Sequence, residues 1–231
     1  MRTDDHNLDV LHEDNHTIVV NKRASDIVQG DKTGDEPLPE IIKRYLKKKY
    51  NKPGNVFCGV VHRLDRPTSG ALVFARTSKA LSRLNAQFRD KTTNKVYWAV
   101  VESSPKQKSG RLSHYLKKNE KQNKSYAHDE KVNGSKHAVL NYIWIASSDK
   151  YHLLEVNLET GRHHQIRCQL AAIGCVIKGD VKYGARRSNK DASIHLHARR
   201  LTFEHPTTKQ DVEVIAPVPQ EPLWSFFEQG I

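Results

Sequence analysis

The stretch "HRLDRPTSGALVFA", residues 62–75, joins a polar loop to an apolar run, and this change of character decides how the chain is interpreted. The apolar run predicts a buried strand over residues 70–76. In the loop, Asp65 lies between Arg63 and Arg66, and a nearby cation keeps a carboxylate ionised and therefore nucleophilic or basic. A lone loop acid is more often a helix cap or turn residue, so both interpretations stay open at this point.

Strand and helix signals alternate on both sides of this loop. Residues 17–22, 94–101, 137–146, 151–159, 194–205 and 211–217 have the β-branched and aromatic content of strands. Helical periodicity covers residues 37–50, 77–90 and 160–174, with a short terminal helix over 221–229. Thr77 or Ser78 would cap the second helix. In the third, Ile166, Leu170 and Ile173 would share a face and Gly174 would end the helix.

These elements predict one α+β domain over residues 1–231 with a mostly antiparallel sheet, because no Pro- or Ser-rich linker divides the chain. Residues 100–136 are polar and are interpreted as long hairpins that stand off the body and carry binding contacts.

Composition limits the classes of protein. No apolar run approaches the roughly 20 residues that cross a bilayer, and the acidic start "MRTDDHNLDV" is unlike a signal peptide, so we expect a cytoplasmic protein without membrane contact. The cysteines Cys58, Cys168 and Cys175 are too few and scattered for a disulfide framework. His195 with His197, or His163 with His164, lacks the partners of a metal site, so we expect no metal.

Charge points toward nucleic acid. The chain holds 38 Lys and Arg against 26 Asp and Glu, a net charge of +12. A field of this sign attracts polyphosphate backbones. The basic residues gather at 43–50, 117–124, 182–190 and 197–200, with tyrosines in or near several clusters. Each cluster is interpreted either as part of an RNA groove or as an ordinary solvated face.

Other chemistries lack their signatures. No second acid is placed at a convincing spacing from Asp65 for a two-carboxylate glycosidase, and neither GxxxxGK[ST] nor GxGxxG occurs. A single ionised aspartate with an aromatic partner suits covalent capture of a substrate without a metal or an activated phosphate.

Four ordered motifs then carry a resemblance. "HRLDRPTSGALVFA", "KVYWAVV", "LETGRHHQIRCQLAAIGCVIKGDVKYG" and "HLHARRLTFEHP" resemble, in order, the signature segments of the RluA family of pseudouridine synthases. The resemblance runs from about residue 8 to the end. It implies the pseudouridine synthase fold, a mostly antiparallel central sheet with helices and loops around an RNA-binding cleft.

The resemblance also implies a reaction and its residues. Uridine in structured RNA, ribosomal or transfer, would be isomerised to pseudouridine without a cofactor, after the base is flipped out of its helix. Asp65 would be the nucleophile, Tyr97 would stack on the flipped base, and Arg167 would pair with the aspartate. Arg63 would fill the gap that the base leaves. The further residues expected to bind RNA are Arg66, Thr68, Arg162, His164, Gln165, Lys182 and Arg199.

The chain departs from the family pattern beside these motifs. His163 stands where Thr is usual, Cys175 and Val176 replace His-Pro, and "KRAS" at 22–25 replaces Lys-Pro-Ala-Gly. We expect these changes to affect substrate choice more than activity. No room is left for a separate S4-like RNA-binding domain, so RNA selection would rest on the catalytic domain, which we expect to be monomeric.

Two alternatives belong to other classes. A catalytically silent RNA-binding module could keep the scaffold, but it would be expected to have lost Asp65, Tyr97 or Arg167. A nucleoside glycosidase acting on small molecules is disfavoured by the basic composition and the long polar segment.

Overall fold

The computed structural model describes residues 2–31 and 33–230. The chain forms two compact units. Unit 1 comprises residues 1–95 and 198–217, and unit 2 comprises residues 96–197 and 218–231. The fold class is α+β, as the sequence predicts, while a single catalytic domain over residues 1–231 stays a prediction.

Unit 1 is built on a sheet whose strands follow the order β1-β2-β4-β10. These strands are β1 (Val10–Glu13), β2 (Thr17–Lys22), β4 (Ser69–Ala75) and β10 (Leu196–Glu204), the last of which enters the unit at residue 198. Strand β3 (Gly59–Val60) pairs with β4, and β11 (Asp211–Ile215) pairs with β10. The β1–β2, β2–β4, β3–β4 and β10–β11 pairs are antiparallel. The predicted strands at 17–22 and 70–76 are confirmed.

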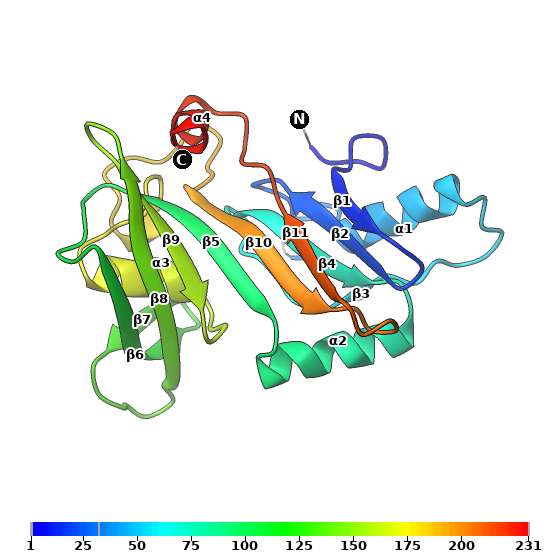
Figure 1. The fold of residues 1–231 in the computed structure, drawn as a ribbon, viewed down its shortest axis with the longest axis horizontal. Helices are drawn as coiled ribbons and strands as arrows, with labels where there is room; N and C mark the ends of the chain where they lie inside the picture. Colours follow the sequence, from blue (N-terminus) through cyan, green and yellow to red (C-terminus); the bar gives the residue numbers. More distant parts are fainter. Residues whose placement is uncertain (1, 32, 231) are drawn as a thin grey trace. The chain divides into compact units, whose positions relative to one another are not determined.

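Two helices of unit 1, α1 (Leu38–Lys49) and α2 (Ser78–Asp90), confirm the predicted periodicity. The Thr77 hydroxyl accepts a hydrogen bond from Ala80 N and caps α2, so the first of the two predicted caps is correct. Leu84 on α2 packs in a cluster with Val73 of β4 and Phe203 of β10. Figure 1 shows α2 close to these strands and crossing their direction in the view. Burial of this apolar face holds the helix on the sheet.

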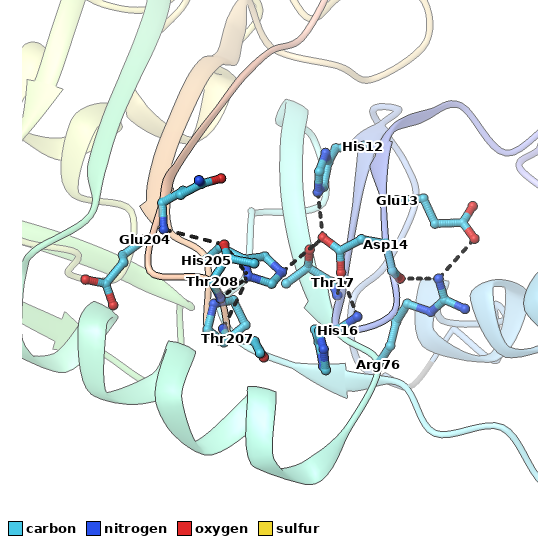
Figure 2. A network of polar contacts seen from close by, with 12 residues as sticks. His12, Glu13, Asp14, His16, Thr17, Arg76, Glu204, His205, Thr207 and Thr208 are labelled. Atoms are coloured by element: carbon cyan, nitrogen blue, oxygen red, sulfur yellow. Dashed lines mark hydrogen bonds and ion pairs between the residues drawn. The ribbon is translucent and has the colours of Figure 1, made fainter.

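A polar network ties the β1–β2 turn of unit 1 to the end of β10 (Figure 2). His12 Nε2 lies 2.8 Å from Asp14 Oδ2, and His205 Nε2 lies 3.3 Å from the same oxygen. Asp14 Oδ1 accepts from the backbone N–H groups of His16 and Thr17 at 2.6 and 2.8 Å. These bonds lower the pKa of Asp14 against the effect of its partial burial, so the carboxylate stays charged between two imidazoles.

Unit 2 carries strands in the order β5-β9-β8-β6-β7. Their bounds are β5 (Asn94–Val101), β6 (Ser109–Asn119), β7 (Lys124–His128), β8 (Lys136–Ser147) and β9 (His152–Leu158). All four neighbouring pairs are antiparallel. The helical elements are α3 (Gln165–Ala172), the 3-10 turn η1 (Val181–Tyr183) and α4 (Pro222–Gln229).

Residues 100–136 do contain a predicted hairpin, since β6 and β7 are antiparallel neighbours, but the interpretation that it stands off the body is wrong. Strand β6 pairs with β8 from Ser109↔Ile143 to Leu116↔Lys136, so most of the segment lies within the sheet. Its polar composition misled because many of its side chains are exposed, while Leu116 and Ser125 are among the few that are buried. A sheet covered on one side keeps polar residues on its other side.

Helix α3 is shorter than the predicted 160–174. It begins only at Gln165, because His164 before it adopts a left-handed backbone with φ of 53°. Ile166 and Leu170 are buried as expected, and Gly174 follows the helix with φ of 80°. Residues 165–170 are all buried, so α3 is an interior helix rather than an amphipathic one.

None of the helices within residues 2–31 and 33–230 has the length and apolar character that crossing a membrane requires.

Candidate active site

Asp65 sits at the start of a tight turn before β4. The Thr68 N–H donates to Asp65 O at 3.0 Å, which closes the turn. Asp65 is half-buried, whereas Thr68 is only 2% exposed. Gly70 follows with φ of 116°, and a β-carbon there would collide with the Ala198 backbone. The turn after Asp65 is therefore held by its backbone, and this arrangement requires glycine at position 70.

Lys22, the last residue of β2, anchors this turn through hydrogen bonds to its backbone. Its side chain is 1% exposed, and Nζ donates to the backbone carbonyls of Arg23, Arg66 and Thr68 at 2.9, 3.1 and 2.7 Å. Burial lowers the pKa of Lys22 to about 7, while the Asp26 and Asp65 carboxylates oppose that shift. Below about pH 7 the ammonium form predominates, its three N–H donors meet three carbonyls, and it places a positive charge near Asp65.

The two arginines beside Asp65 differ in their surroundings. Arg63 is exposed, and its Nη1 donates to the side-chain oxygen of Gln29. Arg66 binds the carboxylates of Asp31 and Asp35. Much of the charge of Arg66 is therefore balanced within unit 1, and Arg63 is the more exposed cation of the loop.

Arg199 is half-buried in unit 1, and its Nη1 donates to Ala216 O at 2.7 Å. Thr68, also expected to bind RNA, has a buried hydroxyl for which no hydrogen-bond partner is found among the described residues. Thr68 therefore lies in the interior, whereas Arg199 is partly accessible to solvent.

Tyr97 belongs to unit 2, on β5. Its side chain is 7% exposed, and the residue stands opposite Val156 of β9. Residues 96–101 of β5 are all buried, so Tyr97 lies on a strand that is covered on both faces.

Arg167, on α3, forms a buried ion pair. Its Nε lies 2.6 Å from Asp180 Oδ2, and its Nη2 donates to Asp180 Oδ1 at 2.8 Å. The two side chains are only 5% and 1% exposed. Parallel bonds of this kind fix both the position and the plane of a guanidinium.

Tyr183, in η1, lies against the same guanidinium. The Arg167 Cζ is 5.1 Å from the centre of the Tyr183 ring, and Lys124 Nζ is 5.0 Å from that centre. The Tyr183 hydroxyl accepts from Ser125 N at 2.9 Å and bonds to His164 Nδ1 at 3.0 Å. Burial raises the pKa of Tyr183, so the phenol stays protonated.

The remaining unit 2 residues expected to bind RNA divide into interior and surface positions. Gln165 is buried: its Oε1 accepts from Thr160 Oγ1 and from Arg162 N, and its Nε2 donates to Val139 O. His164 is also buried and stacks on His163 at 3.8 Å between ring centres. Arg162 and Lys182 are exposed. Only these last two are placed to meet a ligand from solvent.

The basic clusters differ in how far their charge is balanced. In the helix cluster, on α1, four of the five cations are paired with acids: Lys43 with Glu40, Arg44 with Asp5 and Glu36, Lys48 with Asp5, and Lys49 with Glu13; among the described residues Lys47 is the exception. The hairpin cluster is defined here as Lys117, Lys121, Lys124 and Lys182, from β6, β7, their turn and η1. Within residues 2–31 and 33–230, no carboxylate pairs with any of these four lysines. The hairpin cluster therefore keeps its positive charge.

Three residues that contact the candidate site residues or their backbone were not identified from the sequence. Lys22 ends an apolar strand, and a lysine in that position was the one sequence feature that could have indicated a buried cation. Asp180 and Tyr183 lie in "GDVKYG", which was used for the resemblance without giving either residue a role. Their importance is visible only from the contacts that they make.

Comparison with known proteins identifies the family. Residues 16–172 match the model described as RNA pseudouridylate synthase. The chain is 33% identical over 232 residues to an uncharacterized RNA pseudouridine synthase of Synechocystis, covering 97% of this chain and 70% of the relative. It is 34% identical to ribosomal large subunit pseudouridine synthase D of Zymomonas mobilis (93% and 70% covered). It is 31% identical to tRNA pseudouridine synthase C of Pasteurella multocida (93% of each chain).

A solved structure agrees at the level of the fold. Human RNA pseudouridylate synthase domain containing 4 superposes with a TM-score of 0.79 at 22% identity, covering 95% of this chain and 92% of that one. The chain therefore belongs to the RluA-type family of RNA pseudouridine synthases, as its motifs predict. It is an isomerase that acts on RNA, and a silent binding module is not favoured.

Proposed function

We propose that this enzyme converts specific uridines of structured ribosomal or transfer RNA to pseudouridine with Asp65 as its nucleophile. The observation that carries the proposal is the Asp65 turn, in which the family motif is anchored by two bonds from the buried Lys22, to Arg66 O and Thr68 O. A rigid turn with a cation nearby suits a carboxylate that must stay ionised and aimed at a sugar.

Tyr97 and Arg167 complete the proposed catalytic group. Tyr97 would stack on the extruded uracil, and Arg167 would pair with Asp65 during the reaction. Arg63, the exposed cation of the Asp65 loop, would take the place of the flipped base. We propose further that residues 1–231 work as one catalytic domain.

The proposed RNA contact surface is the hairpin cluster rather than the helix cluster. Phosphates bind cations whose charge is not already balanced, and most of the α1 cations are paired with acids. Tyr126 adds an exposed ring beside Lys124, whose Nζ lies 5.4 Å from the ring centre, and RNA bases stack on such rings.

The activity test follows tritium released to water from RNA labelled at the fifth carbon of uracil. Wild-type protein, Asp65→Asn and the control Asp90→Asn would be incubated with ribosomal and transfer RNA from cells lacking the enzyme. Asp90 pairs with Arg89 on the exposed end of α2, so its variant matches the chemical change without touching the site. We expect release by the wild type and Asp90→Asn only.

The same assay separates the alternatives and the two RNA classes. A glycosidase would liberate free uracil, which chromatography detects, and a silent module would bind RNA without releasing tritium. If Asp65→Asn releases tritium at the wild-type rate, the nucleophile assignment is wrong. Release from only one RNA class identifies the substrate class.

The contact surface is tested by the salt dependence of RNA affinity. The logarithm of the RNA association constant falls as the logarithm of the salt concentration rises, and each phosphate contact contributes roughly 0.7 to 0.9 to the steepness of this fall. Replacing Lys117 and Lys121 by Gln should therefore make the slope shallower by about 1.5. Replacing Lys43 and Lys49 by Gln is the matched control and should leave the slope nearly unchanged. The opposite ranking of the two double variants would place the RNA on α1.

We also propose that the enzyme acts as a monomer in the cytoplasm, where its three buried cysteines would remain free thiols. Light scattering of the purified protein would give the mass, and a value near 26.4 kDa is expected.

A further inference from the structure

The Arg167–Asp180 pair of unit 2 is a buried, two-bond ion pair. Both side chains are at most 5% exposed, and two bonds of 2.6 and 2.8 Å join them. A buried arginine needs a partner that compensates its lost hydration, and Asp180 supplies one through the Nε and Nη2 edge. Since the guanidinium is planar and its donors form a fixed fork, holding one edge determines where the Nη1 end points.

Asp180 is itself held firmly by its backbone. Its N–H donates to Ile177 O at 3.0 Å, and its carbonyl accepts from Tyr183 N and Ala185 N at 3.0 and 3.1 Å. Gly179 before it has φ of 86°, and a β-carbon there would lie 2.8 Å from the Asn189 side chain. The turn that carries the carboxylate therefore has little freedom to shift.

The face of the guanidinium is fixed as well as its edge. The Tyr183 ring lies 5.1 Å from Arg167 Cζ, and the Tyr183 hydroxyl is anchored by Ser125 N and His164 Nδ1. A cation over an aromatic face is attracted to that ring. Asp180 and Tyr183 thus both contact the Arg167 guanidinium and limit its movement.

We propose that Asp180 is a positioning residue for the isomerisation: it sets the orientation in which Arg167 acts, and Tyr183 supports that orientation. This inference rests on the proposed function, in which Arg167 takes part in the chemical step. It assigns to Asp180 an effect on the reaction rate that is transmitted entirely through Arg167. Asp180 has no separate contact with RNA in this scheme.

The experiment compares wild type, Asp180→Asn, Arg167→Met and the double variant by single-turnover tritium release at saturating RNA, with RNA affinity measured by filter binding. Asp180→Asn should slow release by about 100-fold, the loss expected when a catalytic group is misplaced by about 1 Å. Its RNA dissociation constant should stay within about threefold of wild type. In the Arg167→Met background, Asp180→Asn should change the rate less than about threefold, because the residue through which it acts is already gone.

Two further variants keep the test decisive if Asp180→Asn fails to fold. Asp180→Glu keeps the charge but moves the carboxylate by one methylene, so we expect about tenfold slower release with RNA affinity unchanged. Asp90→Asn, which breaks a bidentate but exposed arginine pair, should match the wild type. Circular dichroism would confirm that each variant compared is folded.

Distinct outcomes would overturn the inference or its premise. Wild-type release rates in folded Asp180→Asn or Asp180→Glu would show that Arg167 needs no such positioning. Equal slowing by Asp180→Asn with and without Arg167 would show that Asp180 acts independently of it. If wild-type protein releases no tritium from either RNA class, the proposed function itself fails, whereas wild-type activity in Arg167→Met removes only the premise about Arg167.

Discussion

Replacing Lys22 by Met tests whether the anchor beneath the Asp65 turn carries a buried charge. The native amine has a pKa lowered to about 7 by burial, against an ordinary value near 10.5. Between these values the unfolded chain binds a proton that the native protein has released. Stability therefore rises with pH in that window, because the unfolded state is the one that holds more protons.

The magnitude follows from the same two pKa values. Each unit of pKa corresponds to about 1.4 kcal/mol, so the full window between pH 7 and 10.5 is worth about 4 to 5 kcal/mol. Between pH 7 and pH 9 the free energy of unfolding should rise by about 2 kcal/mol through Lys22, since half of the amines are still charged at pH 7. Below pH 6 Lys22 is charged in both states and contributes no slope.

The assay is urea unfolding of wild type and Lys22→Met at several pH values from 6 to 9, with exposed Lys79→Met as the control. All other groups titrate alike in the three proteins, so the difference between curves isolates Lys22. We expect wild type and the control to gain about 2 kcal/mol over Lys22→Met between pH 7 and pH 9. Parallel curves for wild type and Lys22→Met would refute the reasoning. The variant should also slow tritium release, because Thr68 O loses its donor.

Other predictions concern residues of unit 1. His62, whose pKa burial lowers to about 3, accepts from Val73 N at 3.3 Å, so acid should destabilise the wild type between pH 6.5 and 3 more than His62→Gln, as measured by thermal unfolding. Ser25 has φ of 78° where the family pattern has Gly, and Ser25→Gly should raise stability by about 1 kcal/mol in urea unfolding. Thr77→Ala removes the cap bond from Ala80 N and should cost about 1 kcal/mol in the same assay; no change would show that the cap is redundant.

The Ser25 result bears on the departure noted at "KRAS". The sequence raised a question about the exit of the first long strand, where Gly is usual. In the structure, Ser25 N donates to Arg66 O at 2.9 Å, and Ser25 adopts a left-handed backbone with φ of 78°. Glycine would adopt this backbone with less strain than serine does.

Local signals identified most of the regular elements. The β2 and β4 strands, the Thr77 cap and the end of α3 at Gly174 follow from residue type and spacing, which are properties of neighbouring residues. The motifs likewise pointed to the family without knowledge of any contact. Residues 100–136 were wrongly placed off the body because many of their side chains are polar and exposed. The pairing of β6 with β8, which puts the segment in the sheet, cannot be recognised from that composition.

By itself, the sequence determined the α+β class, the family and the candidate roles of Asp65, Tyr97 and Arg167, because these depend on motifs along the chain. Only the tertiary structure decided which charges are balanced and which residues hold the others. Lys22 meets carbonyls more than forty positions away, at Arg66 and Thr68, and Asp180 meets Arg167 across a helix and a turn. Burial and hydrogen bonding between distant segments set these relations, and no local pattern encodes them.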